Sequence, residues 1–491
     1  MSRSILTVFI AFSLALCACA PGVQAQSPAV TRPSSSTATS LPATKVTIEA
    51  SEPAATRTPD PTLTPVPVKP GTFETSVLVT EWNNGKREHL LYPLDPESGQ
   101  ALPGYPPISL GETYNHAFSP DRRILAIATS GSLRLVDLGS WKERVFKLGL
   151  GGYISGMAFE PEGRRLAIIT GSRESKVAVF DLSQEAVTAQ GSLDFLASHL
   201  KFSSDSQGLM VYGTVIQNRF TANEMAAGPP VVVLLDAGDL SPRWSAELEG
   251  LRDGIFPKDR DAGETVDLSQ PGSAVYLYPG LAFAPDRDVL YAVHPDEDKL
   301  TTVDFAEQSV ETVELQNSLT WFERLLALTA GVAHAKVAEG TSRQAVISPD
   351  GQILYVLGVE NKVIKNEEGE WQIVSNPLGL QVIRTADGVR LDRFETEASE
   401  ISISPDGRFL YLSSWGDNQP WTEVFDTTKM KAVARMDGML RLAFRINGDL
   451  LLVLSDWRDE TRVHMMVVDP HSLKVLAEWT GPNEIAWLSA Q

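Results

Sequence analysis

Short apolar runs recur on both sides of turn-forming residues from residue 71 to the C-terminus. The clearest example is the stretch Ile403-Ser404-Pro405-Asp406-Gly407-Arg408-Phe409-Leu410-Tyr411. Proline presets the φ angle of the first turn position, aspartate caps the turn, and glycine takes the left-handed position. The apolar residues on either side therefore predict two strands joined by a tight hairpin.

This hairpin pattern repeats along the chain. Related sequences begin at six further anchor positions, namely Phe118, Phe159, Phe202, Phe283, Ile347 and, in degenerate form, Phe444. A second signal follows most of them, an apolar pair that ends in aspartate, at Asp137, Asp181, Asp236, Asp304, Asp426 and Asp469. An aspartate at a strand end can accept a hydrogen bond from the backbone two residues on and so start the next hairpin. Arg384 stands at this position in the sixth unit, so we expect a different cap there.

The spacing of the anchors predicts the architecture. Where the repeat is tight, the anchors lie about 42 residues apart, the length of a four-stranded β-propeller blade. The N-terminal stretch Ser76–Ile108 has material for three strands but no innermost strand, and Glu484–Leu488 supplies one strand with nothing after it. Pairing these two ends would complete a blade and remove exposed sheet edges. We therefore predict an all-β propeller of eight four-stranded blades, with seven blades as the alternative.

The motif also carries a family resemblance. Residues 404–411, and a variant at 348–355, resemble the Ser-Pro-Asp-Gly-Arg-x-Leu-Tyr signature of bacterial WD40-like and YVTN-type β-propellers, over 71–491. No Gly-His or Trp-Asp pair recurs as in true WD40 repeats, and the YVTN tetrapeptide is never intact. The resemblance implies the fold and leaves the activity open, because such propellers include scaffolds, ligand binders and enzymes.

The first insert into the repeat, at about 251–279, is acidic. It contains Asp253, Asp259, Asp261, Glu264 and Asp267. Carboxylates two residues apart suit a calcium loop, but a third oxygen residue and a bidentate glutamate are missing. We therefore expect a solvated acidic loop and no metal site. A polar loop at 217–230 is typical of an extended hairpin connection.

The second insert, at about 317–343, predicts one inserted helix. Apolar residues follow Ser318 at helical spacing from Trp321 to Ala335. Such a helix must cover its apolar face, and we expect it to pack on the propeller rim. Docking a partner or covering the central pocket is the alternative. His334 and Lys336 on this helix are expected to be solvated or packed.

Local catalytic motifs are missing from the sequence. The seven histidines form no His-Glu-x-x-His pair, no Gly-x-Ser-x-Gly nucleophile motif occurs, and no glycine-rich phosphate loop is found. We expect no catalytic residues, cofactor or metal, although a site assembled from several blades would leave no local motif. Trp415 and Trp421, which flank a proline turn, are expected to pack in a hairpin rather than to stack on a sugar or peptide.

The N-terminus predicts export and anchoring. Residues 1–25 have a positive start, an uncharged run from Ile5 to Leu16, and a small-residue stretch, as in a signal peptide. Leu16-Cys17-Ala18-Cys19 resembles a bacterial lipobox, in which Cys19 becomes the lipidated first residue. Cleavage after Ala25, which would release a secreted protein, is the alternative. Residues 26–70, of which 24 of 45 are Pro, Ser or Thr, predict a disordered tether that favours the anchored form.

The net charge of the chain excludes some classes of binding partner. The chain has 62 acidic against 42 basic residues and a net charge of -20. It lacks the positive charge that nucleic-acid binding needs and would be repelled by anionic lipid, so membrane contact would be through the lipid anchor only. We expect an extracytoplasmic, membrane-anchored propeller that binds or scaffolds a protein partner or a small ligand on one face or in the central channel. The alternative is an extracytoplasmic enzyme of lactonase-like or quinoprotein-like type with a site at the channel.

Overall fold

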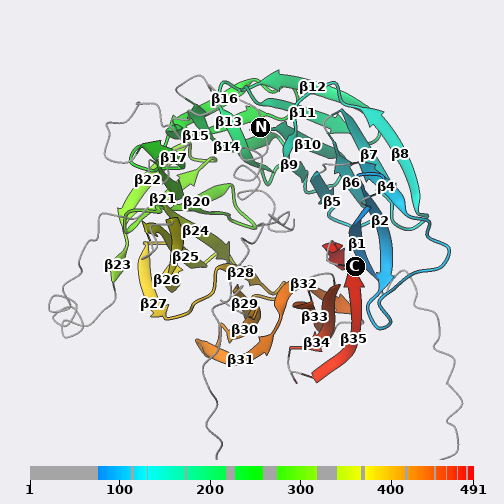
Figure 1. Cartoon of the computed structure of the whole chain (residues 1–491). Coiled ribbons are helices and arrows are strands. Elements are labelled where there is room, and N and C mark those ends of the chain that lie inside the picture. Colours follow the sequence, from blue (N-terminus) through cyan, green and yellow to red (C-terminus); the bar gives the residue numbers. More distant parts are fainter. Residues whose placement is uncertain are drawn as a thin grey trace, which may run out of the picture.

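The computed structural model describes residues 76–490 with gaps at 84, 112–114, 130, 172–173, 217–226, 258–273, 318–339, 366–370, 415–418, 447–448, 460–461, 471, 473 and 483–484. The described residues form strands and turns and contain no helix. The strands make eight sheets that surround a central channel as blades (Figure 1). The prediction of an eight-bladed propeller with four-stranded blades is confirmed. The helix predicted within 317–343 lies outside the described residues.

The blades follow one another along the chain, and the strands of each blade run from the central channel outward. Blade 1 contains β36 (Ile485–Ala490), β1 (Val77–Asn83) and β2 (Glu88–Asp95), with β3 (Gln100–Ala101) and β4 (Ile108–Gly111) both paired to β2. Blades 2 and 3 contain β5 (Asn115–Phe118), β6 (Ile124–Ala128), β7 (Ser132–Asp137) and β8 (Lys142–Lys147), then β9 (Ile154–Phe159), β10 (Arg165–Thr170), β11 (Lys176–Asp181) and β12 (Ala186–Ser192). Blades 4 and 5 contain β13 (Leu196–Phe202), β14 (Gly208–Ile216), β15 (Ala227–Asp236) and β16 (Pro242–Glu247), then β19 (Gly280–Phe283), β20 (Val289–Val293), β21 (Lys299–Asp304) and β22 (Ser309–Glu314).

The remaining blades have the same plan. Blade 6 contains β24 (Gly340–Ile347), β25 (Ile353–Lys365), β26 (Trp371–Arg384) and β27 (Val389–Phe394). Blades 7 and 8 contain β28 (Glu400–Ile403), β29 (Phe409–Ser414), β30 (Trp421–Asp426) and β31 (Lys431–Asp437), then β32 (Met439–Ile446), β33 (Asp449–Asp459), β34 (Arg462–Asp469) and β35 (Lys474–Pro482). Three additional strands come from the inserts: β17 (Gly254–Pro257), β18 (Ala274–Tyr278) and β23 (Gln316–Asn317).

The hydrophobic core is divided among the seams between neighbouring blades. Each of eight buried clusters joins two adjacent blades, so every seam of the ring has its own core. Successive side chains of a strand point to opposite faces of its sheet. In β25, for example, Leu354 and Val356 pack against blade 5, whereas Tyr355 and Leu357 pack against blade 7. Each blade therefore buries both of its faces.

The C-terminal strand closes the ring as predicted. β36 pairs antiparallel with β1, from Val77 opposite Ala490 to Glu81 opposite Ile485. Figure 1 shows the C-terminus beside β1. Val77 and Val79 also pack against Val453 and other residues of blade 8, so the seam between the first and last blades is apolar like the others.

The hairpin turns have the predicted chemistry. The Ser404 hydroxyl donates a hydrogen bond to the Asp406 carboxylate at 2.6 Å and accepts one from the Phe409 amide at 2.9 Å. Gly407 has a φ of 72°, and in blade 4 Ser206 adopts the same left-handed conformation at 61° without being glycine. At Arg384, where the expected aspartate is missing, Asp387 accepts hydrogen bonds from the Arg384 guanidinium and from the Val389 amide. The expectation of a different cap there is confirmed.

Candidate functional site

The connections between strands fall on two opposite faces of the ring. Because neighbouring strands within a blade are antiparallel, the turns after the first and third strands lie on one face, which we call the motif-turn face. The connections after the second strand of each blade, and those between successive blades, lie on the opposite face of the ring, which we call the variable-loop face. The described strand ends that flank the long insertions within 217–230, 251–279 and 317–343 all lie on the variable-loop face, in blades 4 to 6. The repeat is thus interrupted by long insertions on this side of the ring.

Both long inserts contribute strands to blade 6, which the sequence did not predict. β18 runs parallel to β24, with Tyr276 opposite Gly340, and extends the inner edge of the blade. β23 runs parallel to β27 and extends its outer edge. With β17 paired to β18, the sheet reaches seven strands. Strands β25 and β26, of 13 and 14 residues, are also longer than their counterparts in the other blades.

A buried polar cluster lies where the first insert leaves blade 4. Tyr212 on β14 is fully buried, and its hydroxyl donates a hydrogen bond to Asp253 Oδ2 at 2.8 Å. The Thr214 hydroxyl donates to the same oxygen at 3.2 Å. His199 on the inner strand β13 makes an edge-to-face contact with Tyr212 at 5.9 Å between ring centroids, and its Nδ1 lies 2.9 Å from the Ser198 hydroxyl.

Burial perturbs the ionisation of this cluster. It raises the pKa of Asp253 to about 6, against the opposing effect of the hydrogen bonds from Tyr212 and Thr214. It lowers the pKa of His199 to about 4. The Tyr212 hydroxyl keeps its proton, because burial and the neighbouring carboxylate raise its pKa well above the usual value. Near neutral pH the cluster therefore holds a carboxyl that can exchange a proton and an imidazole that is neutral, each in contact with Tyr212. Such perturbed groups are concentrated at functional sites of proteins.

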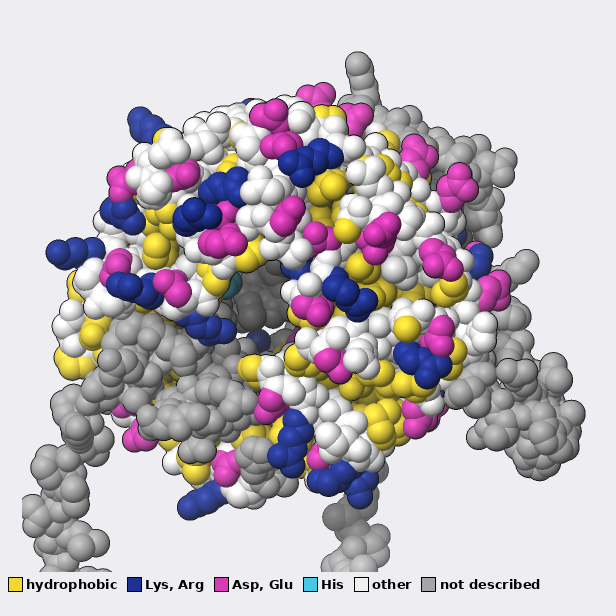
Figure 2. All heavy atoms as spheres, turned by 180° about the vertical axis from the view of Figure 1, so that it is seen from behind, with side chains coloured by type: hydrophobic (Ala, Val, Ile, Leu, Met, Phe, Trp, Pro, Cys, Tyr) yellow, Lys and Arg dark blue, Asp and Glu magenta, His cyan; other side chains and the backbone are white. Residues whose placement is uncertain are grey.

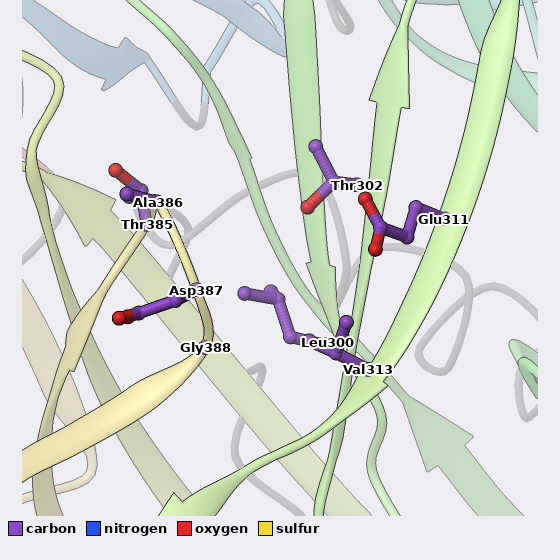
Figure 3. Close-up of a pocket in the computed structure, with 8 residues that line it drawn as sticks. All are labelled: Leu300, Thr302, Glu311, Val313, Thr385, Ala386, Asp387 and Gly388. Carbon is purple, nitrogen blue, oxygen red and sulfur yellow. The ribbon is translucent and has the colours of Figure 1, made fainter.

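A shallow cavity of about 270 Å³ opens between the outer parts of blades 5 and 6 (Figure 3). Thr302 and Glu311 line it from blade 5, and Thr385 and Asp387 line it from the turn between β26 and β27. Asp387 is already bonded to Arg384 at 2.7 Å. The eight lining residues include no histidine, cysteine or serine. This cavity is therefore a weaker candidate site than the cluster around Asp253.

The structure places only some of the residues singled out from the sequence. Asp253 is held by Tyr212 and Thr214, whereas the other four acidic residues of its insert lie outside the described residues. Trp421 is buried, at 6% exposure, under the Arg435 guanidinium at 3.9 Å, which agrees with the predicted packing role. The residues that fall outside the described part of the chain are Cys19, His334, Lys336 and Trp415.

Metal-binding and membrane-spanning features are absent from the described part of the chain. No group of three His, Cys, Asp or Glu side chains there is placed to hold a metal ion. No helix among the same residues is long and apolar enough to cross a membrane. Figure 2 shows one mouth of the central channel, with acidic and basic side chains intermixed around it.

Comparisons with known proteins concern the fold. The family model described as "Lactonase, 7-bladed beta-propeller" matches residues 282–476, from blade 5 into blade 8 of this eight-bladed ring. The solved structure of dihydro-heme d1 dehydrogenase NirN in complex with DHE is similar with a TM-score of 0.50 and 13% identity, over 87% of this chain and 77% of that chain. Hydrazine synthase of Kuenenia stuttgartiensis has a TM-score of 0.39 and 15% identity, over 75% of this chain and 94% of the other. A search of curated proteins found no match. The chain is a β-propeller that is similar over part of its length to the lactonase family.

Proposed function

We propose that this protein is an extracytoplasmic binding module that holds a protein or a small ligand on the variable-loop face of blades 4 to 6. The observation that supports the proposal is that the described strand ends flanking all three long insertions lie on that face, beside the Tyr212–Asp253 cluster. Binding residues are commonly placed on loops that a rigid scaffold positions. A ring with a separate apolar core in every seam is such a scaffold.

Anchoring through a lipid on Cys19 is part of this proposal. It is supported by the lipobox-like Leu16-Cys17-Ala18-Cys19 and by the Pro-, Ser- and Thr-rich stretch 26–70. A flexible chain of that length spans about 35 Å on average, and proline extends it further. The tether would let the variable-loop face meet partners at a distance from the membrane surface.

Site-specific cross-linking in cells tests the binding face. The photoreactive amino acid p-benzoylphenylalanine would replace Glu297 on the variable-loop face or, as the matched control, Glu307 on the motif-turn face of the same blade. Both residues are exposed glutamates. We expect a defined adduct, identified by mass spectrometry, from position 297 and none from position 307. Equal labelling from both positions, or none from 297, would contradict the proposal.

A second function, hydrolysis of a lactone, is favoured by the family match at 282–476. Asp253, whose pKa of about 6 is close to neutral pH, has the ionisation property of a general base, although it lies before the matched stretch. Proton release from simple lactones would measure this activity. Turnover above the spontaneous rate that is lost in Asp253→Asn would favour the enzyme over the binding module.

A further inference from the structure

Arg343 is a buried cation that the protein leaves incompletely hydrogen-bonded. It lies on β24 in the seam between blades 5 and 6, and 9% of its surface is exposed. Its Nε donates a long hydrogen bond, 3.4 Å, to the Pro295 carbonyl, and its Nη1 is buried with no partner. A buried charged donor without an acceptor costs free energy, so such groups are normally paired.

The nearby carboxylates are already engaged with other arginines. Asp298 accepts a hydrogen bond from Arg390 at 2.9 Å, and Asp296 pairs with Arg252 at 3.2 Å. Among the described residues, none forms an ion pair with Arg343. Burial lowers the pKa of Arg343 to about 10, so the side chain stays charged at physiological pH. The seam therefore contains a charged guanidinium that Asp298 and Asp296 influence only through space and whose Nη1 has no acceptor.

A second buried polar group without a partner lies on the same face of blade 6. Gln381 on β26 is 6% exposed, and its Oε1 is buried with no hydrogen-bond partner. Gln381 lies opposite Val356 of β25, whose side chain packs against blade 5. On its other side, Gln381 lies opposite Arg393 of β27. Paired residues share a face of the sheet, so this face carries Arg343, Gln381 and Arg393.

The neighbours of Arg343 show where its side chain lies. Gly358 is paired with Arg343 across the sheet, and a Cβ placed on it would be in ordinary contact with Arg343 Cγ, at 3.5 Å. The side chain then reaches Pro295, which belongs to the connection between β20 and β21 on the variable-loop face. An occupant of this site would therefore come from the same face that carries the inserts.

We propose that the seam between blades 5 and 6 is a binding site for a carboxylate group, which accepts hydrogen bonds from Arg343. The planar guanidinium presents parallel N–H donors that match the two oxygens of a carboxylate, and a charged pair of this kind is stronger than a neutral hydrogen bond. Gln381 can contribute only through its Nε2 amide group, because its Oε1 accepts hydrogen bonds and a carboxylate has none to donate. The inference rests on the proposed ligand-binding role of the variable-loop face and names the ligand chemistry for it.

Calorimetric titration of the purified chain tests the site, with succinate as the probe and chloride at equal ionic strength as the reference. We expect succinate to bind the parent and to bind Arg343→Met at least about tenfold more weakly, as expected for loss of a charged hydrogen bond. Gln381→Leu, which keeps the charge, should weaken binding less. The control is Arg134→Met in blade 2, where Arg134 pairs with Glu143 at 2.8 Å; its affinity should equal that of the parent.

Thermal unfolding without succinate gives an independent readout. Arg343→Met should unfold at the parental temperature or higher, because an unpaired buried cation is replaced by an apolar side chain. No succinate binding by the parent, or equal affinity in Arg343→Met, would overturn the site. Tighter Arg343-dependent binding of inorganic phosphate would overturn the carboxylate assignment. Cross-linking from position 297 remains a separate measurement, so failure of the carboxylate site and failure of the binding face can be distinguished.

Discussion

Asp253 and His199 predict a pH dependence of stability in which two opposite contributions nearly cancel. The pKa of Asp253 is about 6 in the folded protein and 3.8 for an unperturbed carboxyl, so its contribution to stability is greatest below pH 4 and is lost as the pH rises through 6. The pKa of His199 is about 4 and its unperturbed value is 6.5, so its contribution is greatest above pH 6.5 and is lost as the pH falls through 4. Between pH 7 and 4.5 each group changes the free energy of unfolding by about 2 kcal/mol, with opposite sign.

Single substitutions separate the two contributions. Urea unfolding of the parent, Asp253→Asn and His199→Gln would be compared at several pH values between 4.5 and 7. Subtracting the parental free energy of unfolding from that of each variant removes the contribution of the surface carboxylates, which titrate in both proteins. On going from pH 7 to 4.5, Asp253→Asn should lose about 2 kcal/mol relative to the parent, and His199→Gln should gain about 2 kcal/mol. The double variant should follow the pH dependence of the parent.

The reasoning depends on the fold removing water from around both ionisable groups. If the stability difference between each variant and the parent stays constant within about 0.5 kcal/mol across this pH range, burial does not perturb these ionisations. A pH dependence in the same direction for both variants would also refute it, because desolvation must favour the neutral form of an acid and of a base alike.

Three further predictions concern the turn at Asp426, the closure of the ring and the lipid anchor at Cys19. Asp426 is fully buried and accepts hydrogen bonds from the amides and side chains of Thr428 and Lys429. Asp426→Ala should therefore lower the free energy of unfolding, measured with urea, by about 2–4 kcal/mol. The loss should be larger than in Asp304→Ala, at the equivalent turn of blade 5. Deleting 485–490 removes the strand paired with β1 and should lower the unfolding temperature; a truncated chain as stable as the parent would refute the closure role. Replacing Cys19 by Ser should move the protein from the membrane fraction to the soluble fraction, and continued membrane association would count against the lipid anchor.

The blade count and the turn positions were predictable because their chemistry is local. The hydrogen bonds of Ser404 with Asp406 and Phe409 join residues no more than five apart, so the motif carries the same turn wherever it occurs. Ring closure followed from the spacing of these turns together with an unmatched strand at each end. The left-handed Ser206 was not predictable from the glycine pattern, since neighbouring blades position that turn through hydrogen bonds such as the one between Ser206 and Glu162.

The candidate sites depended on contacts between distant segments. Tyr212 and Asp253 are 41 residues apart, and no motif joins them. β18 and β24 pair in parallel across a separation of more than 60 residues, which no turn signal predicts. Asp253 was interpreted from the sequence as part of a solvated acidic loop, whereas the structure places its carboxyl against Tyr212 and Thr214.

The sequence by itself determined the repeat and the chemistry of the turns, because these depend on residues that are close along the chain. It also determined the closure of eight blades, because an unmatched strand at each end of the repeat leaves one blade to complete. Only the tertiary structure decided which polar side chains lose their contact with water. Burial depends on the strands that pack from neighbouring blades. Desolvation raises the pKa of Asp253, and the packing of the seam leaves Arg343 Nη1 without an acceptor.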